Sequence, residues 1–204
     1  MVQGIPETRN AWHAGDGESG NGNRCGIGVE ICYSESGGKK FIAAEKLAAK
    51  FIAEKLDEKI ATKVRAYGKD HVLFTRDTHF ENYLDTREGK LLPVIHCIKG
   101  TPGWELDDAI AKALEGKAYT PVEKLTFGSV ALPRLILQAA GSGDFDITIL
   151  GLCTDICVVS NALILKANFP EKEIIVDSAC CAGVTPQSHE AALATMAMCQ
   201  ITVK

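Results

Sequence analysis

From residue 70 onward, short runs rich in β-branched residues alternate with stretches of helical periodicity. This alternation is typical of a parallel sheet covered on both faces, because parallel neighbours need a crossover connection between them. We therefore expect an α/β protein with three layers (α/β/α) and a mostly parallel sheet. The expected strands are His71–Thr75, Leu92–Ile95, Tyr119–Glu123, Asp146–Leu152, Glu173–Asp177 and Gln200–Val203. The expected helices are Phe41–Tyr67, Glu105–Ala113, Ala131–Ala140, Cys157–Asn168 and Pro186–Met198, the last capped by Thr185.

The length and net charge of the chain limit the number of domains and the kinds of binding partner that we expect. A chain of 204 residues is long enough for one well-buried α/β domain. A formal charge of −4 gives no reason to expect nucleic acid or an anionic membrane as partner. No apolar run approaches the ~20 residues of a membrane span, and no export signal is visible. We expect a cytoplasmic protein with a small-molecule substrate, and its eight cysteines are expected to be reduced thiols.

One cysteine lies at a position that favours a reactive thiol. Cys157 follows the apolar strand Asp146–Leu152 and begins the next expected helix. Unpaired backbone N–H groups and the helix dipole at that point lower the pKa of a thiol and make it a nucleophile. The alternative is that Cys157 is a small hydrophobic core residue. A zinc knuckle built on Cys153 and Cys157 is disfavoured, because the chain lacks a second matching pair.

Two further polar residues accompany this cysteine at the same edge of the expected sheet. Asp77, Lys124 and Cys157 each follow the end of an expected strand. Ligands of doubly wound sheets bind beyond the carboxyl ends of the strands. These three side chains are therefore candidates for one site.

Several ordered motifs point to one family. They are Phe74–His79, His96–Trp104, Glu123–Ser129, Gly151–Val158 and Ala182–His189. Over residues 57–204 the chain resembles the isochorismatase-like cysteine hydrolases, the superfamily that includes nicotinamidases. The resemblance implies attack of a Cys157 thiolate on an amide carbonyl, a thioester intermediate and its hydrolysis by water.

The same resemblance implies roles for other residues. Lys124 matches the catalytic lysine, and the backbone N–H groups of Cys153 and Cys157 would form the oxyanion hole, with a cis peptide near Leu152–Cys153. Asp77, His79 and His96 match the ligands of a divalent metal, for which zinc, iron or manganese are suitable. A further family histidine is Tyr83 here. Alternatively, these residues only hydrogen-bond the loop around His96. His189 is expected on a helix surface.

The first part of the chain is of another kind. Residues 2–56, with the motifs Asn10–Gly17 and Gly26–Cys32, resemble an internal fragment of a zinc-dependent N-acetylmuramoyl-L-alanine amidase. The zinc ligands of that family are missing around these motifs, so a peptidoglycan amidase activity is disfavoured. We expect a fusion of two parts, residues 1–56 and 57–204.

The hydrolase part lacks the family's first strand and its catalytic aspartate. We expect Gly26–Tyr33 to supply the first strand, because an empty slot would expose two strand edges. Glu30 or Glu35 would then have to replace the aspartate, and Glu30 is the catalytic candidate. The sequence thus predicts a hydrolase of a small-molecule amide such as nicotinamide, with reduced or absent activity. An inactive fusion protein is the alternative, and a homo-oligomer is compatible with either.

Overall fold

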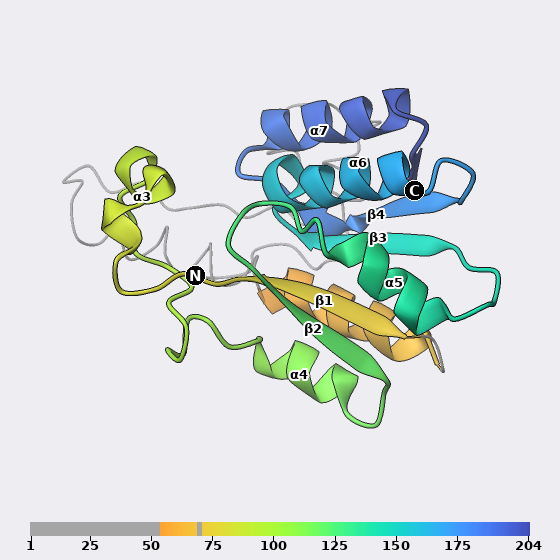
Figure 1. The fold of residues 1–204 in the computed structure, drawn as a ribbon, viewed down its shortest axis with the longest axis horizontal. Helices are drawn as coiled ribbons and strands as arrows, with labels where there is room; N and C mark the ends of the chain where they lie inside the picture. Colours follow the sequence, from red (N-terminus) through yellow and green to blue (C-terminus); the bar gives the residue numbers. More distant parts are fainter. Residues whose placement is uncertain (1–53, 69–70) are drawn as a thin grey trace, which may run out of the picture. The chain divides into compact units, whose positions relative to one another are not determined.

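The structure is a computed structural model that describes residues 54–68 and 71–204 (Figure 1). The chain divides into two units between Lys55 and Leu56, and every described strand belongs to the second unit. The expected strand Gly26–Tyr33, Glu30, Glu35 and the first part of the helix expected over Phe41–Tyr67 lie outside the described residues. Those expectations, and the division into residues 1–56 and 57–204, stay predictions.

Helices and parallel strands alternate along the described chain. The first helix covers residues 54–66. The strands are β1 (Val72–Asp77), β2 (Tyr119–Lys124), β3 (Ile147–Leu152), β4 (Ile174–Ala182) and β5 (Thr202–Val203). The helices are α3 (Arg87–Leu91), α4 (Asp108–Leu114), α5 (Leu132–Ala140), α6 (Val159–Asn168) and α7 (Pro186–Met198). Two further turns are the 3-10 helix η2 (Tyr83–Asp85) and the π-helical η3 (Thr154–Val158).

Every strand pairing in the described part of the chain is parallel. β1 pairs with β2 from Val72 opposite Tyr119 to Asp77 opposite Lys124. A second sheet has the order β3-β4-β5. Among the described residues, β1 pairs only with β2, and β3 only with β4.

Two apolar cores cover opposite faces of the strands. One joins α5, α6 and α7 to β-strand residues that include Val122, Ile174 and Val176. The other joins the helix of residues 54–66 and α4 to Val72 and Phe74 of β1. Successive strand residues point to opposite faces, and so neighbours in one strand enter different cores. This arrangement confirms the expected α/β fold with parallel strands and a helical layer on each face.

The element predictions differ from the structure in one strand, in two short helices and in several bounds. For example, β4 continues to Ala182 instead of ending at Asp177, and the α-helix predicted from Cys157 begins at Val159. Helix α7 begins and ends where predicted, and Thr185 caps it by accepting a hydrogen bond from the Ser188 N–H. The strand predicted over Leu92–Ile95 is wrong. Pro93 has no N–H to donate, and the apolar side chains around it are about half exposed or more, so the segment lacks both a ladder and a core. Helices η2 and α3 were not predicted. None of the described helices has the length and apolarity that a membrane span needs.

Candidate functional site

The site lies at the carboxyl ends of the strands. Asp77 is the last residue of β1, Lys124 is the last residue of β2, and the two are opposite each other in the sheet register. The backbone continues this pairing, because the Thr78 N–H donates to the Lys124 carbonyl at 2.9 Å. β3 ends at Leu152, five residues before Cys157. The structure thus brings together the three residues that the sequence singled out as following strand ends.

A buried lysine connects the thiol to a carboxylate. Lys124 is only 4% exposed, and its Nζ donates to Cys157 Sγ at 3.3 Å. The same Nζ forms an ion pair with Asp77 Oδ1. A buried ammonium without a counter-charge is costly, so this pairing explains the orientation of Asp77. Asp77 was predicted to join His79 and His96 as a metal ligand. In the structure its carboxylate contacts Lys124, and the metal role of Asp77 stays a prediction.

The Cys157 thiol is held inside the turn η3. Its Sγ lies 3.9 Å from Asp77 Oδ2, and its carbonyl accepts a hydrogen bond from Asn161 Nδ2 at 2.9 Å. Burial raises the pKa of the Cys157 thiol and Asp77 adds to this, while Lys124 and the Cys153 backbone N–H act in the opposite direction. The net pKa is raised. The predicted lowering of the pKa is therefore wrong, since desolvation together with Asp77 outweighs Lys124 and the Cys153 N–H.

The backbone before this turn has the geometry expected from the resemblance. The Leu152–Cys153 peptide bond is cis, as predicted. Cys153 precedes η3 and its carbonyl accepts from the N–H groups of Ile156 and Val158. Leu152 is 53% exposed, and because its side chain has no hydrogen-bond donor, only its backbone could contribute to an oxyanion hole. Glu30, the other predicted catalytic residue, lies outside the described residues.

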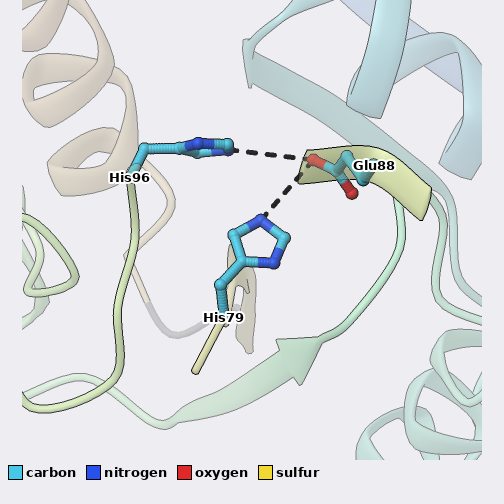
Figure 2. A group of neighbouring side chains, drawn as sticks. All are labelled: His79, Glu88 and His96. Carbon is cyan, nitrogen blue, oxygen red and sulfur yellow. Dashed lines mark ion pairs between the residues drawn. The ribbon is translucent and has the colours of Figure 1, made fainter. Parts of the chain in front are cut away.

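Three side chains near this site form a group that fits a metal ion. His79 Nε2 lies 3.6 Å and His96 Nε2 lies 3.8 Å from Glu88 Oε1 (Figure 2). All three ligand atoms lie within 4.8 Å of one another. His79 Nε2 is buried and has no hydrogen-bond partner among the described residues, which is costly unless a ligand satisfies it. His96 Nδ1 lies 2.7 Å from the Val94 carbonyl oxygen and must donate to it, so Nδ1 carries a proton. In the neutral imidazole, Nε2 then has a free lone pair with which it could bind a metal.

The sequence reasoning missed Glu88. The residue lies in the first turn of α3, which Thr86 caps by accepting from the Gly89 N–H. A Cβ at Gly89 would lie 2.1 Å from the Tyr83 carbonyl oxygen, so only glycine permits this close approach. A Thr-x-Glu-Gly turn within ten residues of His79 is the signal that could have found it.

Tyr83 packs against the side chains of this group and is not one of its candidate ligands. It is 1% exposed, and its hydroxyl donates to the Leu92 carbonyl at 2.9 Å. Its ring lies 4.6 Å from the ring of His79 and 5.0 Å from that of His96. A tyrosine in place of the further family histidine thus packs against both imidazoles and holds them in place.

Comparison with known proteins decides the family. Residues 39–204 match the family model described as the isochorismatase domain. The chain belongs to the isochorismatase family. Its fold is similar to nicotinamidase/pyrazinamidase PncA from Bacillus subtilis, with 26% identity and a TM-score of 0.62 over 74% of this chain and 85% of that chain. It is also similar to pyrazinamidase of Pyrococcus horikoshii in complex with zinc, with 24% identity and a TM-score of 0.59 over 74% and 85%. These matches confirm the predicted family and hydrolase fold.

A second likeness concerns a different enzyme. The isochorismatase-family chain is 58% identical over 72 residues to N-acetylmuramoyl-L-alanine amidase CwlA of Bacillus subtilis (strain 168). This match covers 35% of the chain and 24% of that amidase. The chain thus spans about a quarter of the length of this curated relative. The partial amidase resemblance read from the sequence is confirmed.

Proposed function

We propose that this chain is a cysteine hydrolase that cleaves a small-molecule amide such as nicotinamide through a thioester on Cys157. The observation that carries the proposal is the position of Lys124 Nζ, which contacts both Cys157 Sγ and the Asp77 carboxylate. A nucleophilic thiol needs a proton acceptor and a nearby positive charge, and both are present within this group. The names of the solved nicotinamidase structures supply the substrate class.

The first half of the reaction forms the thioester. The thiol proton passes to Asp77, whose Oδ2 lies 3.9 Å from Sγ, while Sγ bonds to the amide carbonyl carbon. Backbone N–H groups of Cys153 and Cys157 stabilise the oxyanion that develops on the carbonyl oxygen. The C–N bond then breaks, and the nitrogen takes the proton from Asp77 and leaves as ammonia.

The second half regenerates the thiol. Water gives a proton to Asp77 and attacks the thioester carbon, the C–S bond breaks, and the sulfur recovers its proton as the carboxylic acid leaves. The positive charge of Lys124 stabilises whichever of Sγ and Asp77 carries the negative charge. Sγ and Asp77 Oδ2 are 3.9 Å apart without substrate, and contacts of this kind commonly shorten when substrate binds.

His79, Glu88 and His96 would hold a divalent cation in this proposal. Two imidazole nitrogens and one carboxylate oxygen suit zinc, iron or manganese, and the orphaned His79 Nε2 supports the fit. Such a cation would supply a positive charge that orients a substrate atom with a lone pair. The zinc named with the Pyrococcus horikoshii structure favours zinc among the three.

Two alternatives remain as outcomes of the test. A catalytically inactive fusion protein is favoured by the raised pKa of Cys157, since a protonated thiol is a poor nucleophile. A peptidoglycan amidase is supported by partial matches, which cover 24% and 32% of two such enzymes.

We also propose a cytoplasmic location, because all six cysteines in the described part of the chain are free thiols.

The proposal is tested by trapping the intermediate. Nicotinamide is mixed with the full chain, the reaction is quenched with acid, and peptides are analysed by mass spectrometry. A nicotinoyl group on Cys157 and on no other cysteine supports the proposal. A chain that hydrolyses nicotinamide without ever carrying an acyl group on Cys157, or that leaves nicotinamide intact, contradicts it.

A further inference from the structure

His189 contacts the turn that carries Cys157. The residue was predicted on a helix surface, yet it is only partly exposed, and its Nδ1 lies 2.8 Å from Thr154 Oγ1. Thr154 is the first residue of η3 and is fully buried, at 0% exposure. A buried hydroxyl without a hydrogen-bond partner lowers the stability of the folded protein, so this hydrogen bond holds the turn in place.

A second contact joins the same two segments. Both oxygens of Asp155 accept from the Val184 N–H, at 3.2 and 3.1 Å. Burial raises the pKa of the Asp155 carboxyl, but hydrogen bonds from Ser188 and Val184 outweigh it, and the pKa lies below its usual value. Turn η3 and the start of α7 are therefore joined by contacts from two consecutive residues.

The position of the imidazole is itself constrained. A Cβ at Gly183 would lie 2.8 Å from His189 Cβ, so the loop before α7 packs closely against the histidine. Thr185 and Ser188 cap α7 reciprocally and fix the first turn of the helix, on which His189 lies. His189 is thus a rigid support and not a mobile surface residue.

We propose that His189 is a positioning residue, which through Thr154 holds η3 so that Cys157 Sγ stays 3.3 Å from Lys124 Nζ. This inference rests on the proposed function, since it assigns Cys157 as the reacting group. Thr154 lies three residues before Cys157, so a shift of Thr154 displaces the thiol. A misplacement of about 1 Å can lower a rate on the order of 100-fold, and a partial loss of support less.

The experiment removes the hydrogen bond from each side in the full chain. Thr154→Val keeps the shape of the side chain, and His189→Phe keeps a ring. Each variant is expected to lower kcat for nicotinamide about 10-fold with KM within about two-fold, and the double variant to fall about 10-fold rather than 100-fold. Thr154→Ser, which keeps the hydroxyl, is expected to have the kcat of the wild type. Hydrogen exchange of the peptide over residues 152–160 is expected to be faster in both single variants.

A second histidine–threonine pair provides the matched control. His71 Nε2 lies 2.8 Å from Thr120 Oγ1, near the amino ends of β1 and β2 and away from Lys124. Thr120→Val is expected to leave kcat and the exchange of residues 152–160 unchanged.

Three results would overturn the inference: an unchanged kcat in Thr154→Val, an equal loss in Thr120→Val, or unchanged exchange over residues 152–160 in Thr154→Val and His189→Phe. If the wild-type chain does not turn over nicotinamide, the proposed function fails. The exchange of this peptide then decides the role of His189 by itself.

Discussion

Lys124 Nζ lies 3.3 Å from Cys157 Sγ and forms an ion pair with Asp77 in the same buried position. One ammonium therefore contacts a carboxylate at the end of β1 and a thiol in the turn η3, 80 residues apart in the chain. In the proposed function, Asp77, Lys124 and Cys157 carry out the acid–base chemistry, and His79, Glu88 and His96 form a separate candidate metal site.

Replacing the lysine tests the value of its charge. Lys124→Met keeps the length of the side chain and removes the ammonium, so thiolate and oxyanion lose their nearest positive charge. We expect kcat to fall on the order of 100-fold or more. The variant also leaves the Asp77 carboxylate without its partner, so stability falls, by less than the ~3 to 5 kcal/mol of a fully buried pair because the Asp77 side chain is 27% exposed. Kinetics and thermal unfolding measure the two effects, and an unchanged kcat would contradict the role.

Asp77 and Glu30 compete for the role of base. If Asp77 accepts the thiol proton, Asp77→Asn lowers kcat about 100-fold or more, and Glu30→Gln changes it less than about three-fold. Asp77→Glu, which keeps the charge that pairs with Lys124, serves as the control for folding. The reverse ranking of the two amide variants would show that Glu30, as the sequence suggested, supplies the carboxylate.

The sequence predicted the parts of this molecule that depend on local patterns. The parallel strands, the cap at Thr185 and the approach of Asp77, Lys124 and Cys157 follow from periodicity and from the rule on strand ends. The orientation of the Asp77 carboxylate could not be predicted, because it depends on a buried lysine 47 residues away. Glu88 was missed because a short capped helix gives little periodic signal. The raised pKa of Cys157 depends on burial, which a local motif does not report.

Metal binding depends on Glu88 in this account. We expect the wild-type chain to bind one zinc ion in equilibrium dialysis, and Glu88→Gln to weaken binding about 10- to 100-fold by removing the charged ligand. Glu81→Gln changes an exposed glutamate of the same loop and is the matched control. Equal affinities of wild type and Glu88→Gln would exclude Glu88 as a ligand, whatever the activity of either protein.

The buried Cys181 thiol makes the stability of the folded protein fall at alkaline pH. Burial raises the pKa of the Cys181 thiol from its ordinary value of 9.0 to about 11. The folded protein therefore keeps a proton that the unfolded chain loses above pH 9, so this contribution is complete below pH 9 and is lost as the pH rises to about 11. The loss amounts to roughly 2 to 3 kcal/mol. Urea unfolding at several pH values should show this slope in wild type and in Cys199→Ala, an exposed cysteine, but a smaller slope in Cys181→Ala.

The most direct test of the account is ammonia release from nicotinamide by the full chain, by Cys157→Ala and by Cys153→Ala, each with and without added zinc. Cys153→Ala removes a thiol beside the same turn but keeps the backbone N–H that the oxyanion needs. We predict slow release by the wild type and by Cys153→Ala, and release by Cys157→Ala lower on the order of 1,000-fold or more. Equal release by wild type and Cys157→Ala, or no release by a well-folded wild type, would contradict a hydrolase that works through Cys157.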